Sequence, residues 1–150
     1  MGQTLVLIKP DAVQRRLAGE ILTRLERKGL KIVAIKMVHV SPDQARLMYA
    51  VHEGTEFHDR LIKFITAGPS MAAVLAGQDV VEVVREMMGE TCGRQAQPGT
   101  VRGDLAMGRR YNLVHGSDSP ESARREIPIF FAEDELLDYQ PDLDVWIYGD

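Results

Sequence analysis

The residue best placed for chemistry in this sequence is a histidine beside a glycine, just before an expected helix start. In the segment 112–120, an apolar stretch leads to His115, and Ser119 and Pro120 follow as residue types that begin helices. The amides and dipole of a helix N-terminus favour an anion such as phosphate. A neutral imidazole is a nucleophile near pH 7, so His115 is a candidate for phosphate chemistry. The alternative is a histidine that only hydrogen-bonds a turn, which is all that the surroundings suggest for His39, His52 and His58.

Basic side chains occur in a glycine-rich segment that precedes this histidine. Residues 89–111 show little regular periodicity, and a loop of that length inside a compact domain is usually functional. If the fold brings them together with Lys9 and Arg85, four arginines of this segment could bind phosphate: Arg94, Arg102, Arg109 and Arg110. The sequence has no G-x-x-x-x-G-K-[ST] loop, no G-x-G-x-x-G after a strand and no zinc-binding spacing. Cationic side chains are therefore the candidates for binding phosphate.

The elements that must position these residues alternate between strands and helices. Residues 4–9 are apolar and residues 31–40 are rich in β-branched side chains, so both ranges are predicted strands. Apolar residues recur at helical spacing over 17–28, where Gly29 marks the end of the predicted helix. Ser41 is the expected N-cap of a second helix.

The second half of the chain continues this alternation. A helix is predicted over 58–66, a third strand over 70–76 and a short fourth strand over 112–114. Asp79 is predicted to cap a helix over 79–88. Four strands are few for a doubly wound parallel sheet, and a split βαβ pattern of the ferredoxin-like type explains the order as well. Periodicity alone does not choose between the two.

Length and composition favour one globular domain over 1–150. The lone cysteine, Cys92, excludes an internal disulfide and is typical of a reducing compartment. The N-terminus does not look like a signal peptide, and no apolar run approaches the roughly 20 residues that span a bilayer. A net charge of -4 argues against general nucleic-acid binding. These features together predict a cytoplasmic protein without a membrane segment.

Four segments resemble the signature segments of nucleoside diphosphate kinases, in the family's order and spacing. They are Lys9-Pro-Asp-Ala-Val-Gln-Arg15, Met88-Gly-Glu-Thr91, Pro98-Gly-Thr-Val-Arg-Gly-Asp104 and Asn112-Leu-Val-His-Gly-Ser-Asp118. The resemblance extends from about Thr4 to Tyr148. It implies a phosphotransferase with an α+β fold, in which a ferredoxin-like βαββαβ order forms a four-stranded antiparallel sheet covered by helices.

The resemblance implies catalytic roles for five residues. His115 is similar to the family's phosphorylated histidine, whose Nδ1 attacks the γ-phosphorus of the donor in a ping-pong reaction. Glu126 resembles the carboxylate that accepts a hydrogen bond from the other ring nitrogen, and Ser117 resembles the hydroxyl that holds this glutamate. Tyr49 resembles the phenol near the active histidine. Lys9 is similar to a cation that stabilises the phosphates.

The resemblance also implies a nucleotide site that accepts every base. Phe57 resembles the aromatic platform on which the base stacks, a contact that every base can make through its π-face. The residues similar to the family's phosphate and ribose contacts are Lys9, Arg85, Thr91, Arg102 and Asn112. Mg²⁺ is the expected cofactor, held mainly by the nucleotide phosphates, so no protein ligand to the metal is expected.

The sequence departs from the family pattern around the base. Arg109 stands where many relatives place a small apolar residue against the second face of the base, although a guanidinium can also stack. Arg110-Tyr111 replaces Gly-Arg, and Thr55-Glu56 precedes Phe57 in place of a basic residue and proline. These departures affect the expected base contacts and leave the nucleophile unchanged.

The expected partners are ATP and other nucleoside di- and triphosphates, together with further copies of the chain. The resemblance favours a homo-hexamer, with a tetramer as the alternative. The main rival function is a catalytically silent nucleotide-binding interaction module of the same fold. Nucleic-acid binding is a second rival, which the loop arginines permit and the acidic balance disfavours.

Overall fold

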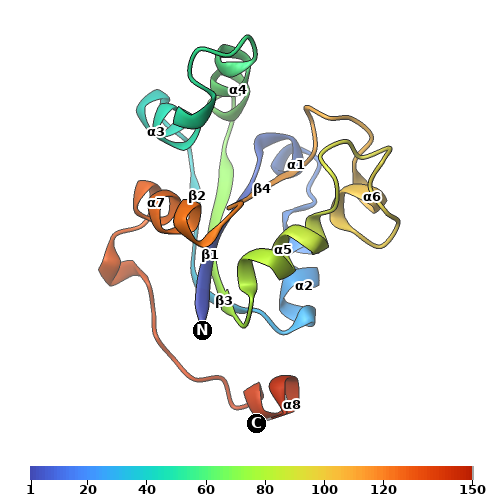
Figure 1. Ribbon diagram of the computed structural model, residues 1–150, viewed down its shortest axis with the longest axis vertical. Helices are drawn as coiled ribbons and strands as arrows, with labels where there is room; N and C mark the ends of the chain where they lie inside the picture. The colour runs from blue at the N-terminus through green and yellow to red at the C-terminus, as the bar shows by residue number, and fades with distance from the viewer. Residues whose placement is uncertain (150) are drawn as a thin grey trace.

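The computed structural model describes residues 1–149, which form a four-stranded sheet covered by helices (Figure 1). The strands are β1 (Gly2–Ile8), β2 (Lys31–Val38), β3 (Ser70–Gly77) and β4 (Val114–Gly116). The order across the sheet is β2-β3-β1-β4, and each neighbouring pair is antiparallel. The ferredoxin-like α+β prediction is therefore confirmed, and the doubly wound parallel sheet that periodicity left open is wrong. The helices are α1 (Pro10–Gln14), α2 (Ala18–Lys28), α3 (Pro42–Met48), α4 (His58–Ile65), α5 (Val80–Met88), α6 (Val101–Leu105), α7 (Pro120–Phe130) and α8 (Asp144–Tyr148), with short 3₁₀ turns η1 (Ala50–His52) and η2 (Glu133–Glu135).

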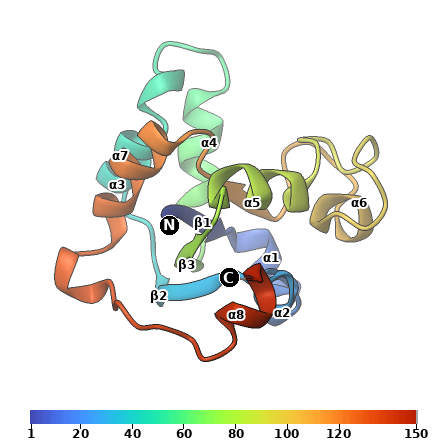
Figure 2. The same cartoon turned by 60° about the horizontal axis from the view of Figure 1, so that its bottom comes forward.

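Helices cover both faces of the sheet because the central strand β1 is apolar on both sides (Figure 2). Leu5 and Leu7 belong to a buried cluster with α3, α4 and α7. Val6 and Ile8 belong to a second cluster with α1, α2, α5 and α6. Alternate side chains of a strand point to opposite faces, so a continuous apolar run such as TLVLI packs against two helical layers.

Several predicted helix ends are confirmed by their capping contacts. The Ser41 hydroxyl accepts the amide of Gln44 at 3.1 Å, and the Gln44 side chain accepts the amide of Ser41 in return. Gly29 ends α2 with a φ of 109°, a left-handed conformation that glycine adopts without strain. Asp79 does precede α5, but its own φ is 49° and its side chain makes no capping hydrogen bond within residues 1–149. The predicted capping role of Asp79 is therefore wrong.

The segment between α5 and α7 differs most from prediction. The strand expected at 112–114 lies instead at Val114–Gly116, because Leu113 has a φ of 76° and cannot continue an extended strand. The predicted loop contains the helix α6, whose N-cap Thr100 accepts the amide of Gly103 at 3.0 Å. A Cβ on Gly103 would lie 1.9 Å from the carbonyl oxygen of Gln97, so this glycine allows close backbone packing.

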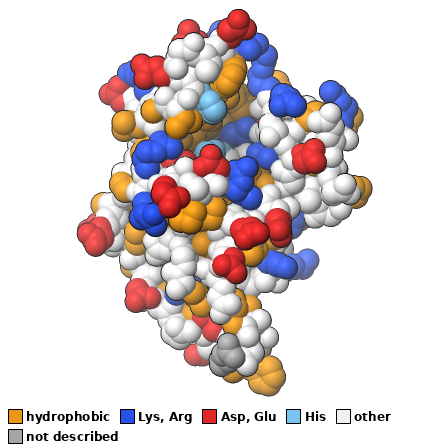
Figure 3. All heavy atoms as spheres, in the orientation of Figure 1, with side chains coloured by type: hydrophobic (Ala, Val, Ile, Leu, Met, Phe, Trp, Pro, Cys, Tyr) orange, Lys and Arg blue, Asp and Glu red, His pale blue; other side chains and the backbone are white. Residues whose placement is uncertain are grey.

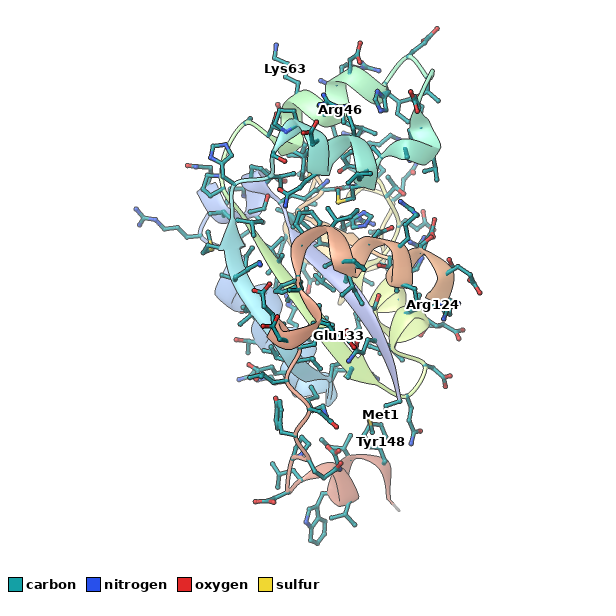
Figure 4. The ribbon with its side chains drawn as sticks, turned by 90° about the vertical axis from the view of Figure 1, so that its left-hand side faces the viewer. Met1, Arg46, Lys63, Arg124, Glu133 and Tyr148 are labelled. Atoms are coloured by element: carbon teal, nitrogen blue, oxygen red, sulfur yellow. The ribbon has the colours of Figure 1, made fainter. Side chains whose placement is uncertain are left out.

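The C-terminal arm, residues 131–149, passes the edge strand β2 and ends beside α2 (Figure 2). The amide of Leu137 bonds the carbonyl of Val33 at 3.1 Å, and the Tyr139 hydroxyl bonds the carbonyl of Ile32 at 2.7 Å. Figure 4 places Met1 and Tyr148 at one end of the molecule, while Arg46 and Lys63, from α3 and α4, lie at the other. Within residues 1–149, no helix is both long enough and apolar enough to cross a membrane.

Candidate active site

A cavity of about 790 Å³ lies between the α3–α4 region and the segments that carry α6 and β4. Figure 3 shows a hollow in this face, with histidine side chains in it and Lys and Arg side chains along its wall. Most of the predicted site residues line the cavity: Lys9, Tyr49, Phe57, Arg85, Thr91, Arg102, Asn112 and His115. Ser117 and Glu126 lie behind His115, whereas Arg94 is not among the described residues that line the cavity.

His115 is the middle residue of β4, where it pairs with Leu7 of β1. Its Nε2 lies 2.6 Å from Oε1 of Glu126, a carboxylate on the buried side of α7. The hydroxyl of Ser117 donates to the same oxygen at 3.1 Å. Because an ionised carboxylate can only accept hydrogen bonds, this contact places a proton on Nε2. Nδ1, which has no hydrogen-bond partner within residues 1–149, is then the nitrogen with a free lone pair.

An aromatic wall lies on one side of this histidine. Tyr49, the C-cap of α3, is buried, and burial together with the negative charge of Glu126 raises the pKa of its phenol, which therefore stays neutral. The His52 ring lies 6.3 Å from the Tyr49 ring and 5.2 Å from the Phe57 ring, centroid to centroid. Phe57 is 42% exposed at the start of α4, so part of its ring can still receive a flat ligand.

Lys9 lines the cavity where β1 ends and α1 begins. Its side chain is buried, and its Nζ donates to Oδ1 of Asn112 and lies 5.3 Å from the centroid of the Phe64 ring. Burial lowers the pKa of Lys9 to about 8; the charge of Asp11 opposes this shift and that of Arg102 adds to it. The Asn112 amide donates in turn to the carbonyl of Thr91 at 3.0 Å. Lys9 is therefore a buried cation in a fixed position.

Arg102 joins three backbone segments around the cavity. Its guanidinium donates to the carbonyls of Asn112 at 3.1 Å, Gly89 at 3.0 Å and Val114 at 2.7 Å. A guanidinium has five N–H donors, so two remain for a ligand. Burial, together with the nearby positive charge of Arg85, lowers the pKa of Arg102 to about 10, against the opposing effect of Asp11. Two neighbouring cations facing one cavity are an arrangement that a bound anion would stabilise.

Some residues of the site were not predicted from the sequence. Arg60 lines the cavity three residues after Phe57, and this spacing along α4 could have indicated that the two share a helix face. Phe64 also lines the cavity, with its ring centroid 5.1 Å from that of Tyr111. Asp11 accepts the amide of Leu113 at 3.1 Å, a contact between distant positions that no periodicity reveals.

Comparison with known proteins gives the same family along nearly the whole chain. Residues 2–136 match the protein family described as "Nucleoside diphosphate kinase". A nucleoside diphosphate kinase of Listeria monocytogenes serotype 4b is 52% identical over 147 residues, which are 98% of this chain and 100% of that relative. A nucleoside diphosphate kinase of Thermomicrobium roseum is 49% identical over 149 residues, which are 99% of this chain and 100% of that relative.

Solved structures agree with these sequence matches. The halophilic nucleoside diphosphate kinase of Halobacterium salinarum in complex with CDP has a TM-score of 0.95 and 46% identity, over 97% of each chain. A nucleoside diphosphate kinase family protein of Babesia bovis has a TM-score of 0.96 and 36% identity, over 99% of this chain and 100% of its own. Sequence identity of about one half over nearly the full length confirms the predicted enzyme class, and the chain belongs to the nucleoside diphosphate kinase family.

Proposed function

We propose that this enzyme transfers the γ-phosphoryl group of ATP to other nucleoside diphosphates by a ping-pong mechanism, through a phosphohistidine at His115. The observation that carries this proposal is the 2.6 Å contact between Nε2 of His115 and Oε1 of Glu126. This contact supports a proton on Nε2, which would leave Nδ1 as the nucleophile in a cavity lined by cations.

The two half-reactions use the same atoms in opposite directions. Nδ1 attacks the γ-phosphorus while the bond to the β–γ bridging oxygen breaks, and the diphosphate leaves with the bonding electron pair. The imidazole becomes more positive as the P–N bond forms, and Glu126 stabilises that charge through Nε2. After the first diphosphate leaves, the terminal oxygen of an acceptor diphosphate attacks the phosphorus and returns the electron pair to Nδ1.

Cationic side chains would stabilise the phosphates during both steps. Lys9, Arg85 and Arg102 line the cavity as positive groups, and Thr91 offers a hydroxyl donor. The lining has one carboxylate, Asp118, and the part of the chain that the structure describes contains no cluster of three His, Cys, Asp or Glu residues that could hold a metal ion. A Mg²⁺ ion held mainly by the nucleotide phosphates would neutralise charge on the transferring group.

The base and ribose would be held by fewer contacts. Phe57 offers a half-exposed ring for stacking, and stacking without hydrogen bonds to the base edge accepts every base. Asn112 and Lys9 would contact the ribose 3′-hydroxyl, since their side chains already touch each other beside the cavity. Arg109 lines the same cavity and would offer a guanidinium to the second face of the base.

The test is covalent labelling with γ-labelled ATP, followed by treatment with acid and with base. Wild-type enzyme should retain label that is acid-labile and base-stable, and His115→Ala should retain none while its circular dichroism stays unchanged. His39→Ala is the matched control, because His39 bonds only the carbonyl of Thr66 among the described residues and lies outside the cavity lining. Label on His115→Ala would contradict the proposal, and ATP binding by the wild type without any label would favour the silent interaction module.

We also propose that the enzyme acts in the cytoplasm as a homo-oligomer, with a hexamer favoured over a tetramer. Apolar side chains of the C-terminal arm support self-association, since Trp146 is 84% exposed and Leu143 is 64% exposed in the single chain. Light scattering coupled to gel filtration should give the mass of six chains. A monomer mass would contradict the proposal.

A further inference from the structure

Leu113 has a strained backbone between two residues that line the cavity, Asn112 and Val114. Its φ is 76°, a backbone conformation that residues other than glycine, asparagine and aspartate seldom adopt. The Leu113 side chain is completely buried. The amide of Val114 bonds the carbonyl of Asn112 at 2.9 Å, so the three residues form a γ-turn of the rare type. This turn separates Asn112 from β4 and thereby sets where Asn112 and His115 lie.

The start of α1 holds this turn at two points. The amide of Lys9 donates to the carbonyl of Leu113 at 2.8 Å. The amide of Leu113 donates to Oδ2 of Asp11 at 3.1 Å. Strained backbone conformations persist only where their surroundings hold them, and here the described surroundings include one backbone amide and one carboxylate.

The other oxygen of this carboxylate has no role in the turn. Oδ1 of Asp11 is buried and has no hydrogen-bond partner within residues 1–149. A buried carboxylate oxygen without a hydrogen-bond partner destabilises the fold, so an aspartate at this position calls for a functional explanation. The charge of Asp11 raises the pKa of both Lys9 and Arg102, against the effect of burial.

We propose that Asp11 is a positioning residue of the phosphotransfer site, whose carboxylate holds the γ-turn at Leu113 and places a negative charge beside Lys9, which bonds the same turn through its backbone amide. The inference rests on the proposed function, because it assigns Asp11 to the placing of groups that would bind phosphate. Asp11 itself is not among the residues that line the cavity, so it acts through Leu113 and Lys9. By contrast, an aspartate in the first turn of a helix ordinarily contributes only a favourable interaction with the helix dipole.

Two variants separate the two roles. Asp11→Asn keeps an oxygen that can accept the Leu113 amide and removes the charge, whereas Asp11→Ala removes both. Asp43→Asn is the matched control, since Asp43 also follows a proline at the first position of its helix but is exposed and pairs with Arg46. The other charged and titratable groups that line the cavity with Lys9 are unchanged in all three variants: Tyr49, His52, Arg60, Arg85, Arg102, Arg109, Arg110, His115 and Asp118.

The first measurement is the pH dependence of kcat/KM and of Mg-ADP affinity by calorimetry. Both Asp11 variants should lose activity and affinity at a pH roughly one unit lower than wild type, because Lys9 deprotonates more readily without its negative neighbour. Asp43→Asn should follow the wild-type profile. Profiles of Asp11→Asn and wild type that coincide would overturn the electrostatic role.

The second measurement is hydrogen exchange of the Leu113 amide at pH 6.5, together with kcat/KM at the same pH. Asp11→Asn should keep the amide protected, and Asp11→Ala should expose it and lower kcat/KM by roughly tenfold, the effect of losing one hydrogen bond to a charged group. A protected amide in Asp11→Ala would overturn the turn-holding role. Labelling of wild-type His115 with γ-labelled ATP tests the proposed function separately. If no label is found, the calorimetric affinities for Mg-ADP still test the role of Asp11.

Discussion

The side chains of His115 and Glu126 form one hydrogen-bonded unit that joins β4 to α7, with 2.6 Å between Nε2 and Oε1. The second oxygen of Glu126 lies 3.5 Å from a nitrogen of Arg125, whose other terminal nitrogen bonds the carbonyl of Leu47 in α3 at 3.0 Å. Glu126 is therefore held between the histidine and an arginine that ties α7 to α3. A glutamate so fixed can orient the imidazole without moving during the reaction.

Glu126→Gln should lower kcat with little change in KM. The amide oxygen can still accept from Nε2, but the charge that stabilises the positive imidazole is lost. A hydrogen bond to a charged group contributes about 1.5–3 kcal/mol, so a loss of roughly 10- to 100-fold in kcat is expected. Glu121→Gln, an exposed residue of the same helix, is the steady-state control. Equal losses in the two variants would argue against a specific role for Glu126.

Phe57→Ala should raise KM for all nucleotides by a similar factor. Stacking contributes about 1–3 kcal/mol per base, which corresponds to roughly 5- to 150-fold in affinity. Phe57→Trp should restore most of the affinity because it keeps a stacking face. The measurement is KM for a purine and a pyrimidine diphosphate, with Val51→Ala as an exposed control outside the cavity lining. A loss confined to one base would show that Phe57 reads base identity instead.

Lys9 should make the enzyme less stable at neutral pH than at alkaline pH. Its folded-state pKa is about 8 against an ordinary value of 10.5, so between these values the unfolded chain binds more protons and stability rises with pH. Below about pH 8, the buried positive charge of Lys9 lowers the free energy of unfolding, and the pKa shift of Lys9 corresponds to roughly 3 kcal/mol at most.

Chemical denaturation at pH 7 and pH 9.5 checks this linkage. Wild-type enzyme should gain more free energy of unfolding between the two pH values than Lys9→Met does, while Lys28→Met, at an exposed position on α2, should gain as much as wild type. Lys9→Met should also be inactive. The two results together would show that the buried Lys9 ammonium is needed for activity and lowers the stability of the fold. An identical gain in all three proteins would contradict the assigned burial cost.

Three exposed arginines at the cavity should speed nucleotide capture. Arg60, Arg109 and Arg110 line the cavity and form no ion pair among the described residues. Exposed charges of one sign raise the association rate of an oppositely charged ligand, and salt screens this effect. Changing all three to glutamine should lower kcat/KM several-fold at low salt and flatten its dependence on ionic strength. Arg27→Gln, exposed on α2, should leave that dependence unchanged.

Local sequence patterns predicted most of the elements. The apolar spacing of residues 17–28 and the caps at Ser41 and Ser119 were sufficient, because helix periodicity and capping depend on neighbours within four residues. The antiparallel order of the sheet was implied only by the family resemblance. Strand pairing joins residues far apart in sequence, so periodicity alone could not choose it.

The sequence by itself determined the family to which the chain belongs, through its four motifs, and predicted phosphate chemistry at His115. Only the tertiary structure decided how the site is held. In the folded chain, Glu126 bonds Nε2 of His115, and Arg102 donates to three backbone carbonyls. Lys9 and Asp11 both bond the backbone of Leu113, which has a positive φ. These contacts depend on β1, α6 and α7 packing around β4, and hydrogen bonds between distant segments leave no periodic trace in the sequence.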